Sequence, residues 1–303
     1  MTNLTPPSAP EHEPSGAAAP NGTDPVPAPP SPASSPSRGT LAAITIAAAI
    51  IGGGALVTVG GGSALAAVAQ VASSDGSGAR STSVDTTGVT GLKVEVGRGS
   101  ATIRFDDVSE ATMRVSGTGS SDWTMRRDGD VLRVDRPNGP FGWWTAGWFG
   151  IDPQMTLTLP RELEGEVTAD LQLDAGSLSA EGRFDALTTR VNAGSLSLDG
   201  GAKTVTTRVN AGSATLRLDD VTTAELSMSA GRLDATISGR QPDDVTLDVS
   251  AGSMDVTVPT GRYALMRDSS AGTIDARIQT DPSSTHRIGA RLSAGSITLR
   301  DGS

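Results

Sequence analysis

Three aspartates in the C-terminal half have a spacing that could hold a metal ion. Asp234, Asp255 and Asp275 each stand three residues after the glycine of an Ala-Gly pair. If equivalent residues of a repeat stack, these carboxylates lie about 5 Å apart, and like charges that close repel unless a cation such as Ca²⁺ neutralises them. The alternative is a solvated face with the carboxylates splayed into water. We favour the solvated face, because no loop matches an EF-hand or the glycine-rich Ca²⁺ nonapeptide.

Side chains that usually carry catalysis are scarce. The chain has no cysteine, and its two histidines are His12 and His286. It contains no G-x-S-x-G motif, no phosphate-binding loop and no metal-binding histidine pair. The three aspartates and Arg277 could imitate the Asp, Ca²⁺ and Arg of β-helix lyases, but charged faces are ordinary in repeat proteins. We therefore expect no enzymatic activity and no cofactor.

The densest aromatic cluster is FGWWTAGWFG, which spans residues 141–150 and follows the turn-like PNGP. Its aromatic residues are Phe141, Trp143, Trp144, Trp148 and Phe149. One interpretation is a contact surface that stacks on envelope sugars or sits at a lipid interface. The other is an apolar plug over the end of the fold.

The overall charge excludes one class of partner. The chain carries a net charge of −10. Phosphate backbones repel such a chain, so we expect no nucleic-acid partner.

The first 83 residues differ in composition from the rest. Residues 1–38 are rich in Pro, Ala and Ser and predict a disordered tail, because they cannot bury enough apolar surface to offset ordering entropy. Residues 39–72 carry no charge and include LAAITIAAAIIGGGALVTV, which approaches the ~20 residues of a transmembrane helix. We interpret them as an uncleaved single-pass anchor, with a signal peptide cleaved near AVAQ at 67–70 as the alternative. Residues 73–83 predict a flexible linker.

The remaining chain repeats itself. TTRVNAGS occurs at 188–195 and again at 206–213, and Ala-Gly pairs recur at intervals of 18 to 23 residues. Such a period is typical of stacked repeats that cannot bury their apolar faces alone. The glycines of these pairs are Gly176, Gly194, Gly212, Gly231, Gly252, Gly272 and Gly295. We expect each to form a structural corner between two strands, where glycine supplies the required backbone freedom.

Apolar residues alternate on both sides of each corner, which indicates strands. Val205 and Val209 share one parity before Gly212, and Leu216 and Leu218 share the other parity after it. Equivalent strands of successive repeats would pair in parallel. We therefore predict an all-β fold, a parallel β-helix-like β-solenoid of about 18–21 residues per coil, wound right-handed. An antiparallel meander curled into a sandwich is the alternative.

Two regions divide this β part. Residues 166–303 carry the regular repeats, and residues 84–165 predict a less regular N-terminal β region that caps their open end. Within the cap, residues 92–105 read as a diverged copy with Gly99 at its corner. Residues 123–134 predict a hairpin about Asp128-Gly129.

Polar residues flank the corners in two columns. One contains Asp174, Asn192, Asn210, Ser229, Ser250, Ser270 and Ser293, and the other contains Ser177, Ser195, Ser213, Ser253 and Ser296. We expect hydrogen-bonded ladders that hold the register, with a flat repetitive binding face as the alternative. The repeat at 263–271 fits least well, because Arg267 stands where an apolar residue is expected, so we expect a bulge there.

One known family shows the same arrangement. LTLPRELEG at 157–165 is followed by serial NAGS and SAGS corners that end in SAGSITLR. Residues 84–303 thereby resemble the family named "putative adhesin", β-strand-repeat proteins with a domain of unknown function that are common in actinobacteria. Arg232 and Thr273 depart from the serine that follows the corner glycine. The resemblance implies surface adhesion and no catalytic residue.

Together these patterns predict a non-enzymatic, membrane-anchored β-repeat module for binding or adhesion at the cell envelope. We expect a cytoplasmic N-terminus and an extracytoplasmic C-terminal domain, because the C-terminal part is the folded cargo. The expected partners are the membrane and a cell-wall glycan, a lipid surface or a protein. A sensor or scaffold of envelope-stress signalling is the alternative, and a polysaccharide lyase-like β-helix enzyme is the third hypothesis.

Overall fold

The part of the chain that the structure describes is all-β, as predicted. The computed structural model describes residues 73–74, 79–117, 123–136 and 153–302. Its elements are β1 (Ser73–Ser74), β2 (Arg80–Val84), β3 (Gly91–Asp106), β4 (Ala111–Ser116), β5 (Thr124–Asp128), β6 (Val131–Asp135), β7 (Gln154–Pro160), the 3-10 turn η2 (Arg161–Leu163), β8 (Thr168–Asp219), β9 (Thr223–Ser238), β10 (Asp244–Val258), β11 (Arg262–Ser269), β12 (Thr273–Arg277), β13 (Gln279–Thr280) and β14 (Arg287–Asp301).

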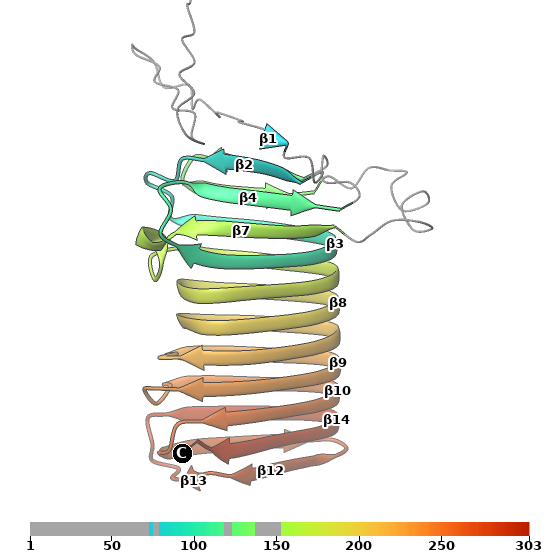
Figure 1. The fold of residues 1–303 in the computed structure, drawn as a ribbon. Helices are drawn as coiled ribbons and strands as arrows, with labels where there is room; N and C mark the ends of the chain where they lie inside the picture. Colours follow the sequence, from blue (N-terminus) through green and yellow to red (C-terminus); the bar gives the residue numbers. More distant parts are fainter. Residues whose placement is uncertain (1–72, 75–78, 118–122, 137–152, 303) are drawn as a thin grey trace, which may run out of the picture. The chain divides into compact units, whose positions relative to one another are not determined.

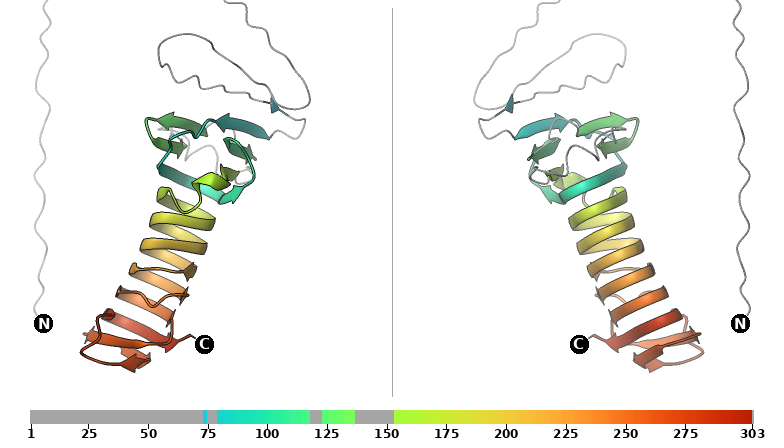
Figure 2. Two further views of the ribbon diagram at one scale, coloured as in Figure 1. Left: turned by 90° about the vertical axis from the view of Figure 1, so that its left-hand side faces the viewer. Right: turned by 90° about the vertical axis from the view of Figure 1, so that its right-hand side faces the viewer.

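The repeats pair in parallel and in register. β3 pairs with β8, β8 with β9, β9 with β10, and β10 with β14. Gly212 lies opposite Gly231, and Gly252 lies opposite Gly295. Figure 1 shows β8 winding through successive turns, and Figure 2 shows these turns from two further sides, each lying on the next. Identical sequence positions therefore occupy equivalent places on neighbouring strands, which explains the repeated TTRVNAGS.

The repeated glycines lie where a side chain has no room. Their φ angles fall between +113° and +131°, a region that residues with a Cβ rarely adopt. A Cβ built on each would lie 1.9 to 2.3 Å from the backbone carbonyl oxygen of the preceding glycine in the stack. On Gly212, for example, it would lie 1.9 Å from the oxygen of Gly194. The same residue type therefore recurs at this position because each glycine packs against the one on the neighbouring turn.

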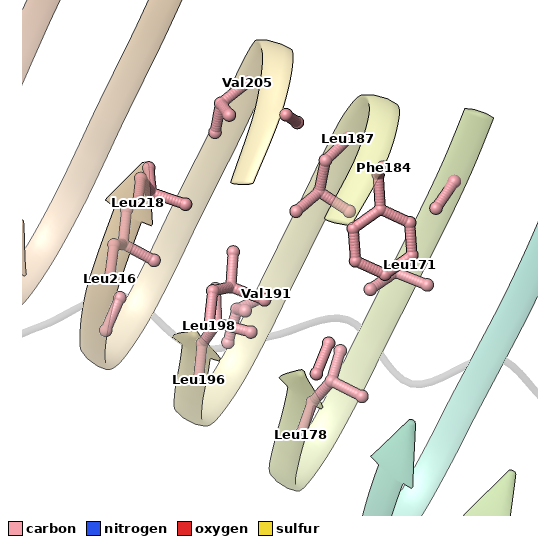
Figure 3. Close-up of a cluster of buried hydrophobic side chains, with 14 of the residues drawn as sticks. Leu171, Leu178, Phe184, Leu187, Val191, Leu196, Leu198, Val205, Leu216 and Leu218 are labelled. Carbon is pink, nitrogen blue, oxygen red and sulfur yellow. The ribbon is translucent and has the colours of Figure 1, made fainter. Parts of the chain in front are cut away.

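The core lies inside the turns and follows the alternation of the sequence. Val205, Val209, Leu216 and Leu218 are all 2% exposed or less. Figure 3 shows such side chains from both sides of the corner pointing into the space that the ribbon encloses. Period-2 alternation together with the change of parity at each glycine places every second side chain in this interior.

Among the described residues, two fully buried threonine hydroxyls lie in this apolar interior without a partner. Thr189 and Thr207 are fully buried, and the Oγ1 of neither has a hydrogen-bond partner. They stand 18 residues apart, at the same position of two successive turns, and Thr207 lies opposite Leu226 on the next strand. A buried hydroxyl without a partner is destabilising, because it gives up its bonds to water.

Replacing Thr189 or Thr207 by valine should therefore stabilise the protein. Valine keeps the branched shape and removes the unpaired hydroxyl, and we expect the free energy of unfolding to rise by about 1 kcal/mol for each substitution. Equilibrium unfolding in denaturant measures the change. Thr206→Val, which alters a partly exposed outward position of the same turn, should leave stability nearly unchanged. A loss of stability in both buried variants would contradict the absence of a partner for these hydroxyls.

The N-terminal part joins the stack through β3. Its first half pairs with β6 and with β8, and its second half pairs with β7 and with β8. β7, β4 and β2 then continue the sheet in antiparallel pairs. The hairpin expected about Asp128-Gly129 is confirmed, because β5 and β6 pair antiparallel with Asp128 opposite Val131. Gly99 lies opposite Gly176, as expected for a diverged copy of the repeat.

The last two repeats do not stack in sequence order. β14 lies between β10 and the pair β11 and β12, so the repeat that contains Gly272 forms the end of the stack. The expectation that every repeat lies on its sequence predecessor is wrong here, and burial explains why. Arg267 occupies an inward column opposite Ala290 yet remains exposed, whereas Ile288, Leu292 and Ile297 of β14 are buried. The less apolar repeat, β11 and β12, therefore lies at the end of the stack. The more apolar β14, which follows it in the sequence, lies between it and β10.

Tyr263 anchors this terminal repeat. Its ring is fully buried, and its hydroxyl donates a 2.8 Å hydrogen bond to the carbonyl oxygen of Pro259. Burial, with a smaller contribution from the charge of Asp301, raises the pKa of Tyr263 to about 12 from the ordinary value of 10.0. The fold therefore holds the phenol proton more tightly than the unfolded chain does. The resulting stabilisation is complete below pH 10 and is lost as the pH rises towards 12.

The chain has a single tyrosine, so the absorbance of the tyrosinate form reports the ionisation of Tyr263 directly. We expect the tyrosinate band to appear with a midpoint near pH 12 in the folded protein and near pH 10 in denaturant. Tyr263→Phe should remove the band and flatten the alkaline decline of stability between those values. A folded-state midpoint near 10 would contradict the burial of this ring.

Within the described residues, no helix is long and apolar enough to cross a membrane. The tail at 1–38 and the anchor expected at 39–72 lie outside the described residues, as does much of the linker at 73–83.

Candidate functional site

Hydroxyl side chains gather on one outer wall of the stack, on β7 and on the strand segments that follow Gly99, Gly176, Gly194 and Gly212. Register places them in two columns. The first contains Ser100, Ser177, Ser195 and Ser213, and the second contains Thr156, Thr102, Ser179, Ser197 and Thr215. We call these nine residues the hydroxyl face. Neighbouring members of a column are one strand spacing apart, about 4.8 Å, and the columns are two residues apart along each strand, ~6.6 Å.

Most of these hydroxyls form no hydrogen bond to another side chain in the described part of the chain. Ser177 donates a 2.9 Å hydrogen bond to Ser100 across the two strands. The other seven make no side-chain hydrogen bond to any residue in the parts of the chain that the structure covers. Every residue of the hydroxyl face except Thr156 lines a shallow hollow of about 270 Å³ that runs across four strand segments. Free donors and acceptors at fixed intervals can bond to a ligand that repeats at a similar interval.

The wall on the other side of the corner is different, because its outward side chains form hydrogen bonds and ion pairs with one another. Asn210 donates to Asn192 at 2.9 Å, and Asn192 donates to Asp174 at 2.8 Å, so a hydrogen-bonded ladder forms along these three members of the expected column. Further along the same wall Arg190 pairs with Asp170 and Arg291 pairs with Asp248. These contacts hold the register and leave fewer free groups for a ligand.

The aspartate column is only partly assembled. Asp234 lies opposite Asp255, as expected, but Asp275 lies opposite Thr298, which separates it from Asp255. The expectation of three adjacent carboxylates is therefore wrong, because β14 inserts between the last two repeats.

Arginines also neutralise the aspartate column. The guanidinium of Arg232 lies 3.4 Å from Asp234 and 3.3 Å from Asp255, Arg300 lies 3.0 Å from Asp255, and Arg277 lies 2.8 Å from Asp275. Contacts with Asp255 and Asp234 raise the pKa of Arg232 above its ordinary value. Across the described part of the chain, no three His, Asp or Glu side chains come together in a group that could hold a metal ion.

His286 also has a structural contact. Its Nδ1 lies 2.8 Å from the carbonyl oxygen of Pro242, and its ring packs edge-on against Tyr263. His12 lies outside the described residues. The aromatic cluster of Phe141, Trp143, Trp144, Trp148 and Phe149 also lies outside them.

Sequence reasoning found one column of the hydroxyl face and missed the other. In the first column Ser177, Ser195 and Ser213 were recognised and Ser100 was not, and the whole second column on the repeats, Thr102, Ser179, Ser197 and Thr215, was missed. A signal was available, because each stands three residues after a corner glycine in the first four repeats, where later repeats carry Asp234 and Asp255. Thr156 could not be found in this way, because β7 belongs to no repeat.

Comparisons with known proteins return distant likenesses. No family model matches the chain, and no curated protein does. A solved "putative cell adhesion protein" from Clostridium sporogenes is 12% identical, covers 74% of this chain and 99% of its own, and gives a TM-score of 0.31. A "putative adhesin" from Bacteroides fragilis is 9% identical with coverages of 74% and 97% and a TM-score of 0.38. A "putative lipid binding protein" from Parabacteroides distasonis is 10% identical, with coverages of 75% and 98% and a TM-score of 0.31.

Proposed function

We propose that this chain is a non-enzymatic binding module whose hydroxyl face docks on a hydroxylated polymer, a glycan of the cell envelope. The carrying observation is the two-column array of serine and threonine hydroxyls, seven of which have no hydrogen-bond partner among the described residues. A glycan offers hydroxyl donors and acceptors along a repeating backbone, so many modest hydrogen bonds can add up on such a wall. The histidine and carboxylate contacts described above give no constellation for acid-base or metal chemistry, which favours binding over catalysis.

The proposal extends to the architecture and the location of the module. We propose that the in-register turns form a β-solenoid, a fold that offers extended walls for binding. We propose that residues 39–72 hold it in the membrane as a single-pass anchor with the C-terminal part outside. This rests on the absence of charge between Arg38 and Asp75. Exposure of residues 79–302 to protease added to intact cells would test the orientation.

The hydroxyl face can be tested with alanine substitutions that change no charge. Full-length protein in mild detergent would be applied to immobilised envelope glycans, and we expect Ser195→Ala, Ser197→Ala and Ser213→Ala combined to weaken retention by about tenfold or more. The matched control combines Ser227→Ala, Ser229→Ala and Ser250→Ala on the other wall. These serines have comparable exposure. Equal retention of the wild type and both triple variants would refute the role of this face.

A further inference from the structure

A second hollow adjoins the hydroxyl face and carries positive charge. It measures about 510 Å³ and is lined by Arg104 and Asp106 of β3, Thr112 and Arg114 of β4, Thr156 and Thr158 of β7, and Val108 of the connecting loop. We propose that this hollow is a binding site for an anionic group of an acidic glycan, a carboxylate or a sulfate or phosphate ester. The inference rests on the proposed glycan-binding function and deepens it by naming the charge of the ligand.

Register brings the two arginines to one place. β7 lies between β3 and β4, so Thr158 is opposite both Arg104 and Thr112, and Thr156 is opposite both Thr102 and Arg114. The two guanidinium groups therefore flank β7 from its two neighbouring strands. The threonine hydroxyls between them form the floor of the hollow.

Most of the donor capacity of this hollow is free. Arg104 is held over the floor by a 3.4 Å hydrogen bond from its Nε to the Oγ1 of Thr158. Arg104 also forms an ion pair with Asp106, but the distance from its Nη2 to the carboxylate is long, at 3.8 Å. Arg114 is exposed and has no ion pair or side-chain hydrogen bond within the described residues, and the hydroxyls of Thr112 and Thr156 make none either.

The other acidic residues near the hollow do not pair with its two arginines. Asp107 and Glu110 lie in the loop between β3 and β4, and Glu181 lies beyond Ser179 on the neighbouring turn. None of them forms an ion pair with Arg104 or Arg114. Elsewhere on the stack arginines such as Arg190 and Arg232 are paired with carboxylates at neighbouring positions. An external anion can therefore supply the partner that the fold supplies elsewhere.

The chemistry of the hollow matches an oxyanion. A guanidinium forms paired, charge-assisted hydrogen bonds to carboxylate, sulfate or phosphate oxygens, and threonine hydroxyls can donate to the remaining lone pairs. Thr102 and Thr156 belong both to the hydroxyl face and to the row that ends at Arg114. One polymer could therefore contact the hydroxyls while placing an acidic group in the hollow.

A glycan fits this surface better than a lipid bilayer does. A protein that inserts into a membrane surface needs exposed apolar side chains beside its basic groups. Among the residues that the structure covers, the exposed large hydrophobic residue is Met266, at 64% exposure in β11, at the opposite end of the stack from β4. Three of the residues that line the hollow, Thr112, Thr156 and Thr158, carry hydroxyls.

The test uses two pairs of polymers, each with the same sugar backbone, in which one member carries acidic groups and the other is neutral. Full-length protein would be titrated with polygalacturonate and its methyl ester, and with dextran sulfate and dextran. We expect the wild type to bind at least one charged polymer about tenfold or more tightly than its neutral counterpart, and to lose that preference as salt increases. Arg104→Gln combined with Arg114→Gln should abolish the preference. Arg114→Gln alone should reduce it, and the fold of this variant should be unaffected, because Arg114 forms no ion pair or side-chain hydrogen bond with any described residue.

The matched control is Arg217→Gln. Arg217 is exposed on the same wall, lies opposite Thr236 and forms no ion pair in the described residues. It should retain the full preference, and an equal loss in this variant would mean that general surface charge, and not the hollow, recognises the polymer. Equal affinity for charged and neutral polymers would overturn the anion site while leaving glycan binding intact. Failure to bind any of the four polymers would overturn the site for these acidic groups. Retention on envelope glycans that still depends on the serines would then show that the hydroxyl face works without it.

Discussion

Replacing Gly212 by alanine should lower the free energy of unfolding by about 4 kcal/mol or more, a loss few single substitutions reach. Two costs combine at this position. The φ of +124° is strained for any residue with a Cβ, and the new methyl group would lie 1.9 Å from the carbonyl oxygen of Gly194. That oxygen belongs to the backbone of a paired strand, so it cannot move away without disturbing the register of two turns.

Gly289 offers a matched control for this glycine substitution. It lies within β14, and an added Cβ would meet no atom within 4 Å. Gly289→Ala should therefore be neutral or slightly stabilising, by up to about 1 kcal/mol, because alanine reduces the entropy of the unfolded chain. Chemical denaturation of both variants compares the effects. If the two cost the same, stacking of glycine on glycine would not be what selects this residue.

The alternation of apolar residues and the regularly spaced glycines account for the part of the fold that could be predicted from the sequence. Apolar residues such as Val209 and Leu216 alternate so regularly about each glycine that strands, corners and inward faces follow from local pattern. The position of β14 does not, because it is decided by competition between two repeats for the interior. The sequence analysis interpreted Arg267 as the sign of a bulge, but β11 pairs with β14 residue for residue, and an arginine on an inward column is tolerated because the stack ends there.

The candidate site was less accessible to prediction, because it depends on pairing between distant segments. Arg104 and Thr158 are 54 positions apart, and β7 brings them together without belonging to the repeat. No periodicity links Arg114 to either residue. The serines of the hydroxyl face, by contrast, recur with the repeat itself, which is why part of that face was visible in the sequence.

Val209→Asp should destabilise the protein by about 4 kcal/mol or more. Val209 is 1% exposed and lies opposite Met228, so an ionised carboxylate there would lose its water without gaining a partner. Burial of the valine side chain, worth ~1.5–3 kcal/mol, is lost as well. Because each turn contacts mainly its neighbours, the damage should spread first to the adjoining turns. Hydrogen exchange should therefore show protection lost in the last turn of β8 and in β9 before it is lost in β3.

Arg208→Asp, one residue away, tests the same parity from outside. Arg208 points outward, with 45% of its side chain exposed, and pairs with Glu225. Its substitution removes that ion pair and places two acidic groups close together, but a surface pair contributes about 1 kcal/mol at most. The difference between the two variants should thus exceed about 3 kcal/mol in equilibrium unfolding. Equal destabilisation would mean that Val209 does not face the interior, and the alternation on which the whole stack is built would have to be reversed at this turn.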